Sequence, residues 1–225
     1  INMYYGGNLT ITNSSFVNNR LAVLGQSKPN IRISNTVFDL NSDDTDNDGG
    51  GLISNGVVTL TNVRFSNNAR STEGAGVTIH GGWALEPATG TITNATFLNN
   101  TSISGAGAVS VGYATVKITN STFTGNTADN SGAILMHQIG DVLTVTNSTF
   151  SYNRANQSTG AADILVNNGR LNLRNNILAN ATYGDFNCKR TGSATVGFSP
   201  NKSNIIEAGN CGNNNNRVTF DPLLG

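Results

Sequence analysis

Apolar and polar side chains alternate along short stretches of this chain, and one such stretch recurs, with small variations, seven times. In the copy Leu143–Phe150, apolar residues at every second position alternate with Thr, as in a strand with one buried and one solvated face. An Asn then interrupts the strand, two small polar residues follow, and Phe150 returns to the apolar side. Each copy therefore predicts a strand, a bend and a second short strand.

The Asn at the bend marks each copy and recurs every 22 to 32 residues. The marker residues are Asn13, Asn35, Asn62, Asn94, Asn120, Asn147 and Asn175. Most copies are preceded by Gly and Ala and then apolar residues, as in Gly74–Ile79, which predicts another strand in each repeat. The short strands of one repeat cannot close a core alone, but stacked copies can pair each strand with its counterpart. The pattern predicts an all-β fold, a parallel β-helix (solenoid) of about seven coils ~4.8 Å apart.

Stacking of the coils assigns the repeated residues to columns. The apolar residues that close the copies are expected to stack in the core, and they are Phe16, Phe38, Phe65, Phe97, Phe123, Phe150 and Leu178. The bend asparagines are expected to form an inward ladder whose amides satisfy backbone groups, and its members include Asn13, Asn62, Asn94, Asn120, Asn147 and Asn175. The Thr residues are expected to face outward.

The repeats end near residue 180, which divides the single domain into repeats over 1–180 and a capping segment over 181–225. Both cysteines, Cys188 and Cys211, lie in this segment. A disulfide between them would close a loop of ~20 residues and contribute about 3 kcal/mol where the repeats have ended. The alternative is two free thiols. The disulfide implies an oxidising, extracellular setting.

The composition describes a nearly neutral polar surface. Charged residues make up 12% of the chain, and the formal net charge is zero. We expect no nucleic-acid partner, because phosphate neutralisation requires clustered Lys and Arg. We also expect no membrane-spanning segment, because no apolar run approaches the ~20 residues that cross a bilayer.

One acidic run suggests a cofactor. Asp44, Asp46 and Asp48 alternate with polar residues as in the first half of a calcium loop, where three oxygens converge on one ion. The second half of the pattern fails, because Asn55 stands where a bidentate Glu would fall. The alternative to calcium is a solvated acidic turn between coils.

The longest spacing between copies places Trp83 and Glu86 on a loop outside the repeats. Trp83 beside this carboxylate could stack on a sugar ring, and the alternative is a ring folded back over its own coil. The histidines, His80 and His137, follow equivalent strands two coils apart. This spacing predicts a separation of ~10 Å and no shared metal.

No catalytic constellation emerges. Enzymes on this fold, such as pectin-degrading ones, need two or three carboxylates on neighbouring coils, or a calcium-bound carboxylate with an Arg or Lys base. Outside the acidic run, the carboxylates are scattered among different faces and the tail. The outward Thr columns resemble those of ice-binding solenoids, but Arg32 and Lys117 interrupt one column, which favours ordinary outward strand residues.

The repeats and the tail resemble two groups of secreted bacterial proteins. Segments of the type Gly132–Ile134 and Asn147–Phe150 are similar to polymorphic outer-membrane protein repeats. The tail, including Asn175–Asn180, Gly184–Cys188 and Asp221–Gly225, is similar to β-helix proteins of the choice-of-anchor type. The resemblance covers nearly the whole chain. It implies a right-handed parallel β-helix that is secreted or displayed on a cell surface, and it supplies no catalytic residues.

These features favour a non-catalytic extracellular solenoid acting as a structural, adhesive or filament-forming subunit. The alternative is a carbohydrate-binding or polysaccharide-cleaving β-helix that uses Trp83, Glu86 and the acidic run. An ice-binding solenoid is a more remote alternative. Because Ile1 begins within a coil and no cap precedes Leu9, we expect either a lost cap or head-to-tail contact with a second copy, which could grow a filament.

Overall fold

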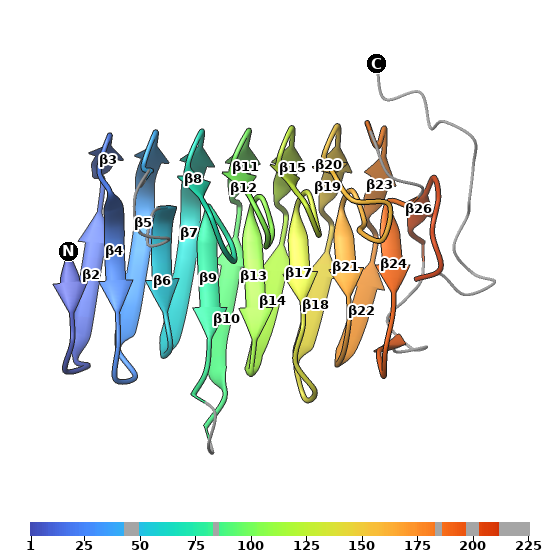
Figure 1. The fold of residues 1–225 in the computed structure, drawn as a ribbon. Coiled ribbons are helices and arrows are strands. Elements are labelled where there is room, and N and C mark those ends of the chain that lie inside the picture. The colour runs from blue at the N-terminus through green and yellow to red at the C-terminus, as the bar shows by residue number, and fades with distance from the viewer. Residues whose placement is uncertain (43–49, 83–85, 183–185, 197–202, 212–225) are drawn as a thin grey trace.

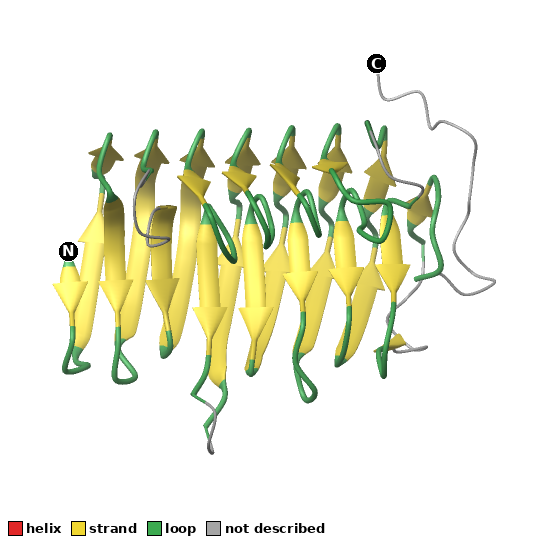
Figure 2. Ribbon diagram, viewed as in Figure 1, coloured by secondary structure: helices red, strands yellow, loops and turns green. Residues whose placement is uncertain are grey.

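The computed structural model describes residues 1–42, 50–82, 86–182, 186–196 and 203–211. Within these residues the chain winds into a solenoid in which successive coils add strands to the same sheets (Figures 1 and 2). The pairings between strands of neighbouring coils are parallel. The predicted all-β parallel β-helix is confirmed.

Three sheets run along the solenoid. Sheet A has eight strands, β1 (Asn2–Met3), β4 (Leu21–Gly25), β6 (Gly50–Ser54), β9 (Val77–His80), β13 (Val109–Gly112), β17 (Ile134–Met136), β21 (Ile164–Val166) and β24 (Cys188–Arg190). Sheet B has fourteen, β2 (Asn8–Thr12), β3 (Ser15–Val17), β5 (Asn30–Asp39), β7 (Val57–Ser66), β10 (Ala88–Thr93), β11 (Thr96–Leu98), β14 (Ala114–Thr119), β15 (Thr122–Thr124), β18 (Val142–Thr146), β19 (Thr149–Ser151), β22 (Arg170–Arg174), β23 (Ile177–Ala179), β25 (Thr195–Val196) and β26 (Ile205–Ile206). Sheet C has four, β8 (Ala69–Arg70), β12 (Thr101–Ser102), β16 (Thr127–Ala128) and β20 (Arg154–Ala155).

Within the described residues, the eight strands of sheet A define eight coils, one more than the repeats predict. The additional coil consists of β24, β25 and β26, which pair with β21, β22 and β23 respectively. These strands have only two or three residues each and lack the repeated Asn-Ser-Thr-Phe pattern. The pairing of strands therefore continues past residue 180 without the sequence signature that marks the other coils.

The disulfide between Cys188 and Cys211 is present, with Cα atoms 5.6 Å apart. Both residues are fully buried and belong to the main core. Cys188 begins β24 and also forms an isolated bridge with Gly209. The crosslink therefore attaches the segment after β26 to the last strand of sheet A.

The closing phenylalanines form a continuous column inside the solenoid. Neighbouring rings are nearly parallel, with centroids 4.5 to 5.3 Å apart and interplanar angles of 2 to 6°. The stack runs through Phe16, Phe38, Phe65, Phe97, Phe123 and Phe150. Strand register places Leu178 opposite Phe150, where it continues the column. All of these residues except Phe16 are fully buried.

The expected inward position of the bend asparagines is wrong. Asn13, Asn35, Asn62, Asn94, Asn120, Asn147 and Asn175 are all solvent-exposed and have φ between 50 and 58°. A residue in the left-handed region turns the backbone, so the usual alternation of side chains fails there. Thr61 and Asn62 consequently both face outward, and Val63 is the next inward residue. Hydrogen bonds of 3.1 Å between side-chain amides link Asn62 to Asn35 and Asn94 to Asn62 on the surface.

A different asparagine column lies at the corner that follows each Phe of the stack, and its members are buried except for the exposed Asn19. From Asn19 to Asn126, each side-chain Nδ2 donates to the Oδ1 of the equivalent residue in the next coil over 2.8 to 3.0 Å. The members are Asn19, Asn41, Asn68, Asn100, Asn126 and Asn153. Each Oδ1 from Asn41 onward also accepts the backbone N–H of the preceding member. This buried Asn ladder satisfies polar groups that the corner removes from water.

Candidate functional site

Loops that connect sheet C to sheet A cover part of the outer face of sheet A. Leu135 and Leu165 point away from the main core, yet they are buried in a second cluster with Ala106 and Ala161 from these loops. Isolated bridges connect the loops of successive coils. Strands β4, β6 and β9 instead border an open groove, and its lining includes Leu24, Ile53, Glu73, Thr78 and His80. This groove combines apolar side chains with a carboxylate, a hydroxyl and an imidazole.

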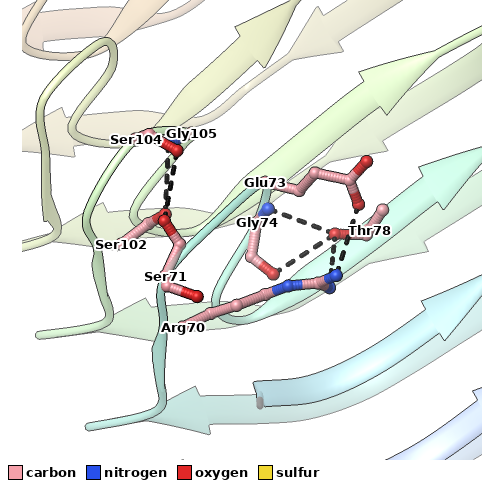
Figure 3. Close-up of polar contacts among 8 residues, drawn as sticks. All are labelled: Arg70, Ser71, Glu73, Gly74, Thr78, Ser102, Ser104 and Gly105. Atoms are coloured by element: carbon pink, nitrogen blue, oxygen red, sulfur yellow. Dashed lines mark hydrogen bonds and ion pairs between the residues drawn. The ribbon is translucent and has the colours of Figure 1, made fainter. Parts of the chain in front are cut away.

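An ion pair lies at the rim of the groove (Figure 3). Arg70, at the end of β8, is buried, and its Nη2 lies 3.6 Å from Glu73 Oε2. Arg70 Nη1 donates to Thr78 Oγ1 over 3.4 Å, and the N–H of Gly74 donates to the same oxygen over 3.1 Å. The guanidinium therefore ties the loop carrying Glu73 to the outer face of β9. Glu73 and Arg70 therefore balance each other's charge at the groove.

The neighbouring coil supports this loop from one side. Ser104 Oγ donates to the carbonyl of Ser71 over 3.1 Å, and the N–H of Gly105 donates to Ser102 Oγ over 3.2 Å (Figure 3). A Cβ on Gly105 would lie 2.2 Å from the carbonyl oxygen of Glu73, so this close approach requires glycine. The position of Glu73 is thus fixed by backbone contacts between two coils.

The two histidines lie much closer together than the expected ~10 Å. Their ring centroids are 5.7 Å apart, and Tyr113 contacts His80 edge-on with centroids 5.5 Å apart. Strand register places Gly112 beside His80 in the intervening coil. Because Gly112 has no side chain, the imidazoles on either side can approach each other. The sequence interpretation assumed that the intervening coil would keep them apart, and this assumption is wrong.

The surroundings of His137 favour its neutral form. Burial lowers the pKa of His137 below its ordinary value, and the nearby His80 lowers it further. Asp141 and Glu73 act in the opposite direction. The Nε2 atom of His137 is buried and has no hydrogen-bond partner among the described residues.

The structure describes only one of the residues proposed to bind a ligand or calcium. Glu86 is exposed and forms an ion pair with Lys28, which is also exposed. Trp83 lies outside the described residues, as do Asp44, Asp46 and Asp48. The sugar-stacking and calcium hypotheses therefore remain predictions.

Each carboxylate in the described ranges has a structural partner. The contacts are Glu73 with Arg70, Glu86 with Lys28, Asp39 with Ser66 and Asn67, Asp129 with Asn156, Asp141 with the N–H groups of Ala114 and Gln138, Asp163 with Asn153 and Asn187, and Glu207 with the N–H of Asn180. Within these ranges, no group of three or more His, Cys, Asp and Glu residues could hold a metal ion. The described acids thus act mainly in holding coils and loops together.

Asp163 ends the buried Asn ladder. Its Oδ1 accepts from Asn153 over 2.8 Å, and its Oδ2 accepts from Asn187 over 2.9 Å. The side chain is completely buried, and this burial raises the pKa of Asp163 to about 7, although the hydrogen bonds from Asn153 and Asn187 oppose the rise.

We expect Asp163 to make the protein less stable as the pH rises from about 5 to 7. The folded state holds the proton up to a pKa of about 7, whereas the unfolded chain releases it near 3.8. Between these values the folded state binds more protons, so stability falls with rising pH, at most by about 1.4 kcal/mol per unit. Urea unfolding of the wild type and Asp163→Asn from pH 5 to 8 measures this contribution.

The stability of the wild type relative to the variant is expected to fall as the pH rises from 5 to 7, whatever the absolute stability of the variant, because only the wild type has the titrating group. His137 is present in both proteins, so its opposite contribution cancels in the comparison. Parallel pH profiles for the two proteins would contradict the assignment to Asp163.

The outward Thr columns are in register across sheet B. Strand pairing aligns Thr12, Ser34, Thr61, Thr93, Thr119 and Thr146 in one column. In the neighbouring column, Arg32 lies between Thr10 and Thr59, and Lys117 lies between Thr91 and Thr144. The face is therefore regular in its backbone, but charged side chains interrupt its array of Thr residues.

Comparison with known proteins gives one match. Residues 1–150 match the family model described as right handed beta helix region. No curated protein and no solved structure matches the chain. Among the described residues there is no helix long and apolar enough to span a membrane.

Proposed function

Because the chain belongs to the right-handed β-helix family, we propose that it is a non-catalytic extracellular solenoid, a structural, adhesive or filament-forming subunit of a cell surface. The observation that carries the proposal is the engagement of each described carboxylate in a structural contact. Hydrolysis or elimination on a polysaccharide needs a carboxylate or a base that is free to exchange protons with the substrate. At the groove, Glu73 is held in such a contact by Arg70.

The regularity of the coils supports a structural role. Phe rings and Asn amides repeat from coil to coil in the core, and short polar residues dominate the outer face of sheet B. Such a solenoid resists bending because each coil is bonded to the next along several columns. The zero net charge would also let several copies lie side by side without strong repulsion.

The disulfide supports the proposed location. Disulfides persist in oxidising compartments and are rare where thiols are kept reduced. The link between Cys188 and Cys211 is compatible with secretion or display at a cell surface.

Polysaccharide binding is the second candidate, and the groove beside β4, β6 and β9 favours it. Leu24 and Ile53 supply apolar surface there, and Glu73, Thr78 and His80 supply polar groups. This combination of an apolar surface with a few polar groups is typical of ligand sites. Binding without cleavage at this groove would suit an adhesive role as well.

A polysaccharide screen that records binding and cleavage separately tests the proposal. We expect no new reducing ends and no unsaturated products from any polymer, with or without calcium. Turnover that is abolished by Glu73→Gln, Asp46→Ala or Glu86→Ala would overturn the non-catalytic assignment. Binding without turnover would support the adhesive form, and Thr119→Ala on the outer face of sheet B is the matched control.

Electron microscopy of the purified protein at high concentration tests the filament-forming form. Strand edges of terminal coils can pair with other strands, so head-to-tail growth would appear as unbranched fibres. Isolated particles at all concentrations would rule out self-assembly of this chain into filaments.

A further inference from the structure

His80 and His137 border a small gap above Gly112. A Cβ built on Gly112 would lie 2.9 Å from Nε2 of His80 and 2.6 Å from Nε2 of His137. Both nitrogens therefore lie within 3 Å of the same point, on two coils that flank the glycine. Strand order explains this arrangement, because β13 with Gly112 lies between β9 and β17 in sheet A.

The gap contains an unsatisfied ligand atom. Nε2 of His137 is buried and has no hydrogen-bond partner among the described residues. A buried polar atom without a partner is costly and is rare in native structures. An electron-pair acceptor in the gap would remove this cost, and imidazole is the commonest protein ligand of metal ions.

The spacing of the rings suits one shared metal ion. A ring nitrogen lies ~1.1 Å from its centroid and ~2.0–2.1 Å from a bound zinc ion, so two imidazoles on one metal have centroids roughly 5–6.5 Å apart. The observed separation of 5.7 Å falls within this interval. Neither ring needs to leave its coil to reach a common ion.

A nearby carboxylate favours a cation. Asp141 acts on His137 electrostatically and favours positive charge at its position, whereas the charge of Glu73 is offset by Arg70. His80 also lines the open groove, which gives an ion and its water ligands a route to the gap. Imidazole ligands select zinc, nickel or copper, whereas calcium takes oxygen ligands, so this site differs chemically from the acidic run at Asp44, Asp46 and Asp48.

We propose that His80 and His137 together bind a divalent transition-metal ion of the zinc, nickel or copper class across Gly112, with water completing the coordination. With two protein ligands the site is weaker than structural zinc sites, which have four. The ion links two coils that are separated by a third, and it occupies the space that a side chain at position 112 would fill.

Isothermal titration of the tag-free full chain with Zn²⁺ tests this site. We expect one equivalent to bind, and His80→Asn and His137→Asn each to weaken binding at least tenfold. Gly112→Ala is expected to abolish binding, because its methyl group would fill the gap between the two nitrogens. Gly82→Ala is the matched control, since a Cβ there meets no heavy atom within 4 Å, and it is expected to bind as the wild type does.

Electron paramagnetic resonance of the Cu²⁺-loaded protein identifies the ligands independently. We expect hyperfine coupling to two imidazole nitrogens in the wild type, and to fewer in each His variant. Circular dichroism of every variant establishes whether the fold is retained. If Gly112→Ala does not fold, the two His variants decide the outcome. Unchanged Zn²⁺ affinity in a variant that carries both His80→Asn and His137→Asn, or imidazole coupling to copper in that variant, would overturn the proposal.

Discussion

Phe123→Ala is expected to lower the free energy of unfolding by about 3–5 kcal/mol, because it removes a fully buried ring from the middle of the core. The ring lies between Phe97 and Phe150, with centroids 4.7 and 4.5 Å away. The solenoid backbone is held by strand pairing on both sides, so it cannot collapse to fill the space. Chemical denaturation followed by circular dichroism measures the loss.

Thr119→Ala provides the control for this prediction. Thr119 ends β14 on the outer, partly exposed face, so its replacement is expected to cost less than about 1 kcal/mol. Equal losses in the two variants would show that the Phe column contributes no more to stability than the outer Thr face does.

Asn126→Ala is expected to destabilise the protein by a similar amount, on the order of 4 kcal/mol, because it breaks the buried Asn ladder at its centre. Asn126 Oδ1 accepts from the backbone N–H and from Nδ2 of Asn100, over 3.0 and 2.9 Å. Its Nδ2 donates to the carbonyl of Phe97 and to Oδ1 of Asn153, both over 3.0 Å. The variant removes the side-chain acceptor of the buried Asn100 N–H and the side-chain donor to the Phe97 carbonyl. Asn100 Nδ2 and Asn153 Oδ1 each lose one hydrogen bond but keep another, to the Phe65 carbonyl and from the N–H of residue 126.

The matched control is Asn120→Gly, at the exposed bend of the same coil. Asn120 has φ of 52°, a conformation that glycine adopts without strain, so the change is expected to cost less than about 1 kcal/mol. Denaturation measures both variants, and amide hydrogen exchange should show faster exchange at Asn100 in Asn126→Ala alone. Similar stabilities for the two variants would contradict the distinction between buried and exposed asparagine columns.

The core of the fold could be predicted from the sequence because its signal is repeated. Alternation of apolar residues with Thr identified the strands, and one Phe per copy identified a column that the ring contacts now show as a stack. The disulfide followed from there being only two cysteines, both near the end of the repeats. In each case one residue type at a fixed position in the coil carried the information.

The position of the buried asparagines could not be predicted from alternation alone. The expectation placed the bend Asn in an inward ladder, whereas the left-handed backbone at Asn62 and its equivalents turns the side chain outward. A signal for the buried ladder was nevertheless present, because an Asn stands three residues after each Phe, as Asn126 does after Phe123. Recognising it would have required comparing columns at both corners of the coil.

The candidate site was less predictable, because it depends on what is missing from a coil. The approach of His80 to His137 depends on the absence of a side chain at Gly112. The number of coils between the two histidines gives their backbone separation, but it does not show that the rings can lean toward each other over a glycine. The Arg70–Glu73 pair depends on how a loop folds back over sheet A, which local residue patterns do not specify. The eighth coil lacks the motif altogether, so only the observed pairing reveals it.

The direction of the buried Asn ladder bears on how such a chain can lengthen. Along the ladder from Asn19 to Asn153, each link runs from the Nδ2 of one Asn to the Oδ1 of its C-terminal neighbour. A duplicated coil that carries its own Asn would present the same acceptor on one side and the same donor on the other. Duplication or deletion of whole coils between Asn41 and Asn126 would therefore leave every Asn–Asn hydrogen bond of the ladder with a partner. The terminus is different, because Asp163 accepts from both Asn153 and Asn187 and reverses the direction. Growth by coil duplication is therefore compatible with the interior of the solenoid and is blocked at the coil that holds Asp163.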